Sequence, residues 1–182
     1  MFQRILVAVD GSPASNAGLK SAIELAADQH ATLLLLHVID DSALAPGFEG
    51  GFAVPSYIDM FYDALRDTGR KVLAKAGAAA KVAKVESKLV LAEARAATVA
   101  HVIVRQARKL KADIIVIGTH GRRGLRRVLM GSDAEAVVRE AGVPVVLVRG
   151  AIARKRKPLA DAALLTRSVR SPAKPARPAA RN

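Results

Sequence analysis

The stretch Ile5-Leu6-Val7-Ala8-Val9 places five apolar residues in a row, and Asp10-Gly11-Ser12-Pro13 follows it directly. An apolar run without polar alternation is typical of a strand that is buried on both faces, as in the middle of a parallel sheet. Ser12 is a residue type that caps helices, and Pro13 suits the first helical position, where its missing N–H costs nothing. The stretch therefore predicts a buried strand, a turn and the start of a helix.

The same alternation of strand and helix continues up to residue 150. Apolar runs predict four more strands, at residues 32–39, 85–91, 113–118 and 143–148. Helical spacing of apolar residues predicts helices at residues 13–27, 57–84 (interrupted or frayed near Gly69 and Gly77), 97–111 and 133–141, and residues 40–56 read as a long loop. This order predicts an α/β fold: a small doubly wound sheet of five parallel strands with helices on both faces.

The loop after the fourth predicted strand has the features of a phosphate site. From Gly118 to Ser132 it shows the spacing Gly, two residues, Gly, nine residues, Gly-Ser, and it opens a helix. Glycines let backbone N–H groups approach an anion, and a helix N-terminus supplies unpaired donors and the positive end of a dipole. Ligands of such sheets bind beyond the carboxyl ends of the strands, where the strand order reverses.

A plain structural interpretation of this loop stays open. Ser132 and Glu135 match the S-x-x-E capping box of ordinary helices, and glycines often serve only to turn the chain. The loop is not a P-loop, because no Gly-Lys-Ser/Thr follows a glycine run. Residue types alone leave phosphate binding and simple capping as alternatives.

Taken in order, these segments resemble the universal stress protein family. The resemblance covers about residues 1–150 and rests on Asp10-Gly11-Ser12, residues 36–40 (Leu-His-Val-Ile-Asp), residues 113–124, Gly131-Ser132-Asp133-Ala134-Glu135 and residues 144–148. It implies a sheet like that of the adenine nucleotide alpha hydrolases, a homodimer and, in the branch with this glycine spacing, bound ATP. It also implies a stress-response module regulated by nucleotide.

The resemblance further implies which residues contact the nucleotide. Asp10 would meet ribose or adenine, with Ala8 and Val9 beside the base, and Val38 would contact adenine through its backbone. The remaining residues would surround ribose and phosphates: Gly118, Thr119, His120, Gly121, Arg122, Arg123, Gly124, Gly131, Ser132, Asp133 and Ala134. Asp133 departs from the family pattern, which often has an apolar residue at this position. It either complements the helix dipole or meets Mg²⁺ bound with ATP.

No catalytic or metal-binding set emerges from the residues. His37 lies in an apolar strand and is interpreted as a core histidine, while His120 lacks a nucleophile and base around it. We therefore expect a binding module rather than a dedicated enzyme. A weak ATPase or phosphotransfer protein is the alternative, and nonspecific nucleic-acid binding through a basic tail is another.

The charge of the chain is concentrated after Gly150. Of the net +13, nine basic residues and Asp161 give residues 151–182 a charge of +8, which leaves +5 for residues 1–150. The tail also carries four prolines and few large apolar residues, so it is expected to be disordered and able to contact polyanions.

Two further expectations concern location and assembly. The chain has no cysteine and no apolar run of about 18 residues, and its first residues lead straight into a strand, so we expect a cytoplasmic protein without a membrane span. Val145 to Val148 is short, apolar and uncharged, and in the family's sheet order it forms an edge. It is expected to pair with a second copy in a homodimer.

Overall fold

The computed structural model describes residues 1–41, 55–95, 97–121 and 130–150. The chain divides into two units, Met1–Ala151 and Ile152–Asn182, and every described residue belongs to the first. The second unit, the predicted disordered tail, lies outside the described residues. So do Arg122, Arg123 and Gly124 of the predicted phosphate loop.

Five parallel strands form one sheet in the order β3-β2-β1-β4-β5. They are β1 (Arg4–Ala8), β2 (Thr32–Ile39), β3 (Ser87–Glu93), β4 (Ile114–Gly118) and β5 (Val145–Val148). Ile5 of the central strand is in register with Leu33 on one side and Ile114 on the other. The predicted parallel sheet is confirmed, and its strand order reverses between β1 and β4, where such sheets hold ligands.

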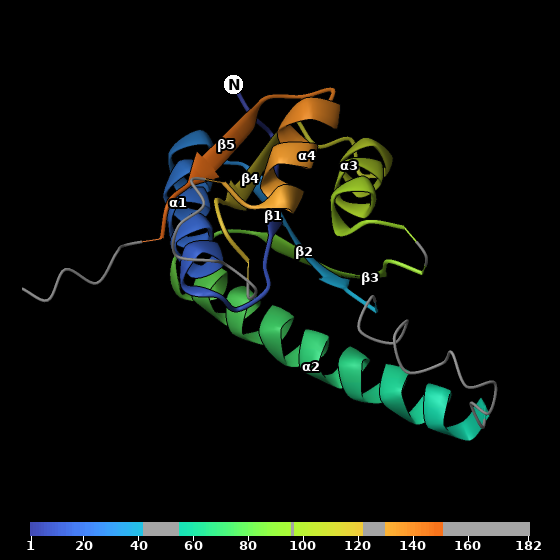
Figure 1. Cartoon of the computed structure of the whole chain (residues 1–182). Coiled ribbons are helices and arrows are strands. Elements are labelled where there is room, and N and C mark those ends of the chain that lie inside the picture. Colours follow the sequence, from blue (N-terminus) through green and yellow to red (C-terminus); the bar gives the residue numbers. More distant parts are fainter. Residues whose placement is uncertain (42–54, 96, 122–129, 151–182) are drawn as a thin grey trace, which may run out of the picture. The chain divides into compact units, whose positions relative to one another are not determined.

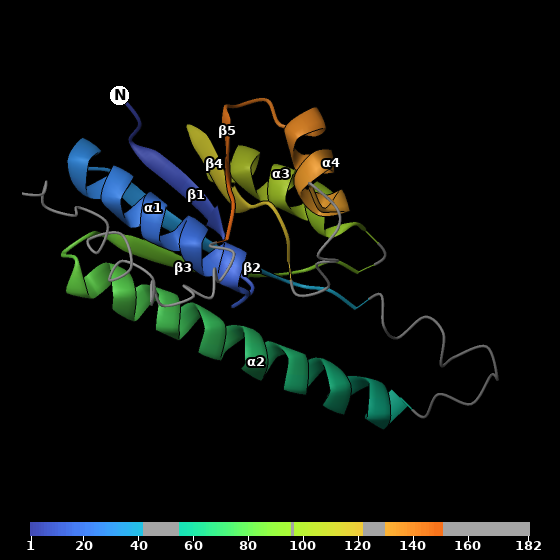
Figure 2. The same ribbon diagram turned by 60° about the vertical axis from the view of Figure 1, so that its left-hand side comes forward.

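Helices cover both faces of the sheet (Figures 1 and 2). They are α1 (Pro13–Gln29), α2 (Pro55–Val82), α3 (Val99–Lys109) and α4 (Ser132–Glu140). Alternate residues of β1 point to opposite faces: Ile5 and Val7 pack with side chains of α1 and α2, and Leu6 packs with those of α3 and α4. Both core layers consist of aliphatic side chains, as the scarcity of aromatic residues indicates.

The start of α1 forms as the sequence predicts. The Ser12 hydroxyl accepts a hydrogen bond from the Ser15 N–H at 3.2 Å, and Pro13 occupies the first helical position. Ser12 and Ser15 are both buried, so this cap is part of the domain interior. It anchors the turn that follows β1.

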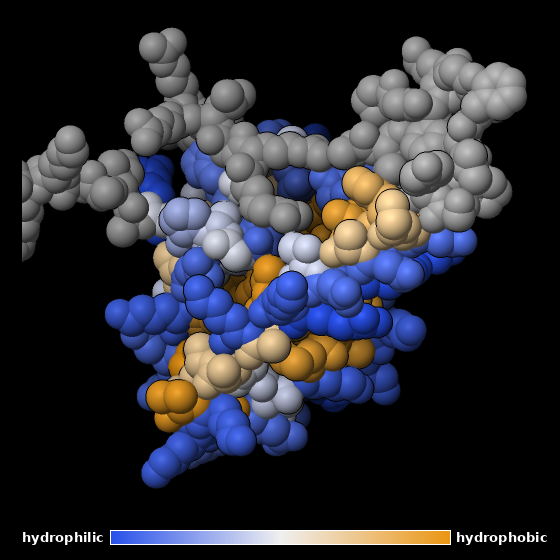
Figure 3. Space-filling view, turned by 90° about the horizontal axis from the view of Figure 1, so that it is seen from below, coloured by the Kyte–Doolittle hydropathy of each residue, from blue (hydrophilic) through white to orange (hydrophobic). Residues whose placement is uncertain are grey.

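The predicted interruption of α2 near Gly69 and Gly77 is wrong, because the helix is continuous. Both glycines instead let α2 approach the sheet: a Cβ at Gly69 would lie 2.7 Å from His37 Cδ2 and from Leu91 Cδ1, and one at Gly77 would lie 3.1 Å from Leu89 Cδ2. The outer face of α2 shows apolar patches among hydrophilic side chains (Figure 3). Among the described helices, α2 included, none is long and apolar enough to cross a membrane.

Strand β3 begins two residues later than predicted. Lys84 adopts a left-handed conformation with φ 58°, and the Val85 N–H donates to Ala80 O at 3.0 Å. Val85 therefore still closes the end of α2, and pairing with β2 starts at Ser87. From the apolar pattern alone, Val85 could not be distinguished from a valine within the strand.

Candidate functional site

Asp10 is fixed at the carboxyl end of β1 by the turn that it starts. Its Oδ1 accepts from the Ser12 N–H at 2.8 Å, and its own N–H donates to Ser15 Oγ at 3.0 Å. The turn is tight because Gly11 has φ 82°, a conformation that glycine adopts without strain. The second carboxylate oxygen of Asp10 is thus held toward the loop after β4.

The loops after β1 and β4 are in contact, as expected at the point where the strand order reverses. A Cβ at Gly121 would lie 3.0 Å from Asp10 Oδ2, so the backbone passes directly beside the carboxylate. Ser12 Oγ donates to His120 O at 3.4 Å. The predicted site residue Asp10 therefore lies near two others, His120 and Gly121, which follow it by more than a hundred residues in sequence.

The N-terminus of α4 lies beside the same loop. Gly131 is its N-cap, no side chain caps it, and the first intrahelical bond runs from the Glu135 N–H to Gly131 O at 3.0 Å. The capping box between Ser132 and Glu135 does not form, because Ser132 already lies within the helix. The amides of Ser132 and Ala134 thus precede the first intrahelical bond, the arrangement that binds anions at helix ends.

Gly131 differs from the sequence expectation in one respect. Its N–H donates to Thr119 O at 2.8 Å, so this amide is occupied and does not add to the open donors. The bond instead closes the loop between β4 and α4, because it joins its first and last residues. Thr119 is buried, its N–H bonds Val148 O at 2.9 Å, and its hydroxyl lies 3.0 Å from His120 Nδ1.

Gly118 is needed for the close packing of α1 on the sheet, and not to let an anion approach the backbone. A Cβ there would lie 2.7 Å from the Ala14 carbonyl carbon and 2.9 Å from the Ser15 backbone nitrogen. A Cβ at Gly150 would lie 3.0 Å from Ala14 Cα. The first turn of α1 is thus seated against two glycines, which sets its distance from the sheet.

The residues expected to line the base divide between the two faces of the sheet. Ala8 and Val38 are partly buried and pack against the core on the side of α3 and α4. Val9 belongs to the core on the side of α1 and α2. Its N–H donates to Leu36 O at 2.8 Å, and its carbonyl lies 2.6 Å from Nδ1 of His37, which is buried as the sequence indicates.

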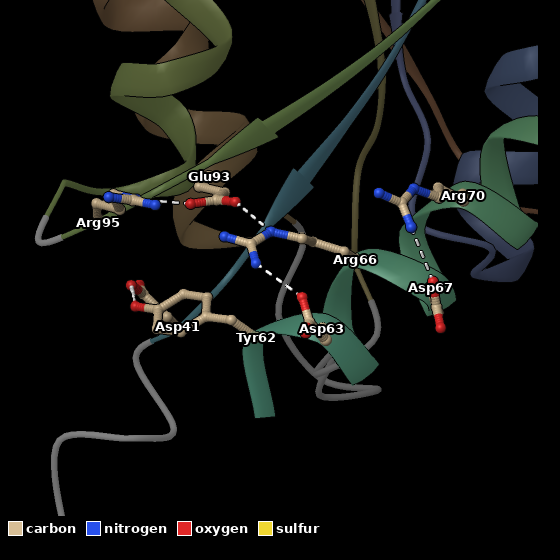
Figure 4. A network of polar contacts seen from close by, with 8 residues as sticks. All are labelled: Asp41, Tyr62, Asp63, Arg66, Asp67, Arg70, Glu93 and Arg95. Atoms are coloured by element: carbon tan, nitrogen blue, oxygen red, sulfur yellow. Dashed lines mark hydrogen bonds and ion pairs between the residues drawn. The ribbon is translucent and has the colours of Figure 1, made fainter. Parts of the chain in front are cut away.

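A polar network that the sequence did not indicate joins α2 to the ends of β2 and β3 (Figure 4). Tyr62 donates its hydroxyl hydrogen to Asp41 Oδ2 at 2.6 Å. Glu93 accepts from Arg66 Nε at 2.8 Å and from Arg95 Nε at 2.6 Å. Tyr62 and Arg66 are more than twenty residues from Asp41 and Glu93 in sequence, so no local motif identifies these two contacts.

The network changes the acidity of its members. The hydrogen bonds from Arg66 and Arg95 lower the pKa of Glu93 below its ordinary value of 4.5. The bond to Asp41, together with burial and the charge of that carboxylate, raises the pKa of Tyr62 above 10.0. At neutral pH Glu93 therefore stays ionised and Tyr62 stays neutral. The network links α2 to the ends of β2 and β3 and does not form an acid–base pair.

The described part of the site offers backbone donors and the carboxylate of Asp10, and the first turn of α4 also carries the acidic Asp133 and Glu135. No group of three His, Asp or Glu residues close enough for a metal ion occurs within the described ranges. Backbone amides at a helix end suit a phosphate, and a carboxylate at a strand end suits the hydroxyl groups of a sugar. These groups could together hold a phosphorylated ligand.

Comparison with known proteins gives the family. A family model described as "Universal stress protein family" matches residues 1–149. A universal stress protein A homolog of Coxiella burnetii is 34% identical over 147 residues, which cover 81% of this chain and 96% of the relative. A solved member of the family from Burkholderia pseudomallei is 35% identical, with a TM-score of 0.63, and covers 80% of this chain and 95% of its own. The chain belongs to the universal stress protein family.

Several solved structures with this fold contain a nucleotide. The universal stress protein of Archaeoglobus fulgidus in complex with dAMP is 23% identical, covers 80% of this chain and 97% of its own, and has a TM-score of 0.58. Two others, 21% and 18% identical and each with a TM-score of 0.58, were solved with cAMP and with AMP. At these identities the likeness to this chain is one of fold.

Proposed function

We propose that this chain binds ATP at the carboxyl ends of β1 and β4 and acts as a nucleotide-dependent stress-response module. The observation that carries the proposal is the contact between Asp10 and the backbone at Gly121, beside the uncapped N-terminus of α4. It joins a sugar-binding carboxylate to phosphate-binding amides in one place. The adenine nucleotides in structures of the same fold support this ligand class.

The proposal assigns parts of the nucleotide to parts of the site. Asp10 accepts a hydrogen bond from the ribose, Ala8 and Val9 lie beside the base, and Val38 contacts the adenine through its backbone. The first turn of α4 donates to the phosphates, and Arg122 and Arg123, which lie outside the described residues, supply positive charge. ATP would enter as its Mg²⁺ complex, with the ion held mainly by the phosphates.

Two expectations from the sequence belong to the same proposal. The module forms a homodimer through β5, so that occupancy of two nucleotide sites can alter one shared surface. It works in the cytoplasm, which fractionation of cells producing the protein would test. No hydrolysis step is part of the proposal.

Calorimetry with Mg-ATP on nucleotide-stripped protein tests the site. We expect a dissociation constant in the micromolar range, about 8 kcal/mol of binding free energy. Gly131→Glu should weaken binding at least tenfold, because it adds negative charge where the phosphates approach. A Cβ at Gly131 meets nothing closer than Thr119 O at 3.4 Å, so the variant should fold.

Gly142→Glu is the matched control for this variant. A Cβ at Gly142 meets no atom within 4 Å, and the residue lies at the other end of α4. It should bind ATP as the unchanged protein does. Equal ATP affinity in the two variants would place the nucleotide elsewhere on the protein. No heat of binding with millimolar ATP would show that the protein does not bind this nucleotide.

A further inference from the structure

A cavity of about 490 Å³ lies between α1 and α2, which run side by side over one face of the sheet (Figure 2). Its apolar lining includes the buried Val9, Leu19 and Ala76 and the half-buried Ile23 and Val72. Small-molecule sites usually measure about 300–1,000 Å³ and are mostly apolar. The cavity has the size and lining of such a site, and it lies on the face of the sheet opposite to Ala8 and Val38.

The end of the cavity near β1 offers little to a polar ligand. A Cβ at Gly11 would lie 3.7 Å from Val72 Cγ2, so the turn after β1 comes near α2 with no side chain of its own between them. The carbonyl of Gly11 already accepts a hydrogen bond from Asn16 Nδ2 at 3.1 Å. A ligand therefore gains most by placing an apolar chain inside, since each buried methylene contributes favourably.

The rim of the cavity carries net positive charge. Lys20 of α1 and Lys75 of α2 line it, together with Glu24. Glu24 reaches Lys20 at 4.0 Å in a largely exposed pair, which adds little stability. Lys75 makes no ion pair or hydrogen bond within the described ranges. Its long stem can bring the ammonium group to a negative charge at the mouth of the cavity.

We propose that this cavity binds an amphiphilic carboxylate, with its alkyl chain between α1 and α2 and its carboxylate at Lys75. The apolar lining selects the chain, and the single uncompensated charge at the rim selects an anionic head over a cationic one. Val9 and Gly11, which line the cavity, flank Asp10 in the chain. The ligand would therefore lie against the same turn as the proposed nucleotide site, but its binding does not depend on that site.

Calorimetry of the full chain with decanoate, below its micelle concentration, tests the position of the ligand. Ala79 lines the cavity and is exposed, so Ala79→Phe should fill the space and weaken binding at least tenfold while the protein stays folded. Ala78 is exposed on the same helix without lining the cavity, and Ala78→Phe should bind decanoate as before. Octanoate should bind more weakly than decanoate, by about fourfold per methylene.

The charge is tested separately. Lys75→Gln should weaken decanoate binding severalfold and leave decanol binding unchanged, while Lys71→Gln, an exposed lysine outside the cavity, should change neither. Absence of saturable binding would overturn the proposal. The proposal would also be overturned if Ala79→Phe left decanoate binding intact and added salt abolished it. That result would place the anion on other basic residues. A dimer that Ala79→Phe dissociates would show instead that a second copy occupies the groove.

Discussion

At Gly118 the backbone of the sheet lies so close to α1 that no side chain fits between them. A Cβ there would overlap the Ala14 carbonyl carbon at 2.7 Å, and backbone atoms cannot move aside as a flexible side chain can. Gly118→Ala should therefore lower the free energy of unfolding by about 1–3 kcal/mol, the usual range for overpacking. Urea denaturation measures this.

Gly142→Ala serves as the comparison for Gly118→Ala. It meets no atom within 4 Å, so it should be neutral or slightly stabilising, because alanine restricts the unfolded chain. A Gly118→Ala protein as stable as Gly142→Ala would mean that α1 can shift away from β4 at little cost.

Glu93 makes part of the stability depend on pH. Its pKa is lowered in the folded protein by the hydrogen bonds from Arg66 and Arg95. A lowered folded pKa stabilises the protein fully above the unfolded value near 4.5, and this stabilisation is lost as the pH falls through the folded pKa. Glu93→Gln should therefore cost about 0.5–1 kcal/mol at pH 7, the scale of a solvent-screened ion pair.

Denaturation at several pH values checks the effect of Glu93. The difference between Glu93→Gln and the unchanged protein should shrink as the pH falls below 4.5. Glu140→Gln, at an exposed position that makes no hydrogen bond or ion pair with another described residue, should be about as stable as the unchanged protein across this pH range. A constant deficit in Glu93→Gln would assign its effect to packing rather than to charge.

At the scale of elements, the two edge strands of the sheet differ in charge. β5 is uncharged and exposes Val146 and Leu147, whereas β3 exposes Leu89 beside Lys88. Charged side chains, lysine above all, protect an edge from pairing with another chain. The contrast favours β5 over β3 as the edge of the proposed homodimer.

Matched substitutions at the two edges distinguish them. Leu147→Lys should convert the homodimer to a monomer, because it places a charge in the interface, and Leu89→Lys should leave the dimer intact. Light scattering at micromolar concentration measures the mass of each. A monomeric unchanged protein, or a dimer broken by Leu89→Lys alone, would contradict assembly through β5.

Across the whole molecule, the described fold and most of the net charge lie in different parts of the chain. The described residues all lie in the unit Met1–Ala151, while +8 of the +13 charge lies in residues 151–182. Truncation after Gly150 keeps the glycine that packs against Ala14. It should leave the melting temperature and ATP affinity nearly unchanged.

The same truncation should remove most nonspecific binding to DNA, because that binding follows net positive charge and weakens with salt. Hydrogen exchange of the full chain provides the second measurement. Strong protection across residues 159–166, or a large loss of stability on truncation, would make the tail part of the folded structure.

The sequence predicted the elements well and their close contacts poorly. Apolar runs such as 32–39 located the strands, since burial on both faces leaves a pattern that is independent of neighbours. Gly69 and Gly77 suggested breaks in a helix, because glycine weakens helices in isolation. Their use in letting α2 approach His37 and Leu89 was invisible, since those partners come from strands elsewhere in the chain.

By itself the sequence determined the α/β class, the strand and helix order and the position of the loops beyond β1 and β4, because these follow from local periodicity and turn chemistry. Tertiary structure alone decided that Asp10 lies against Gly121, that the Gly131 amide is already bonded and that Glu93 receives two arginines. It also decided the cavity between α1 and α2. Such features arise where distant segments meet, and their geometry depends on packing that no single segment encodes.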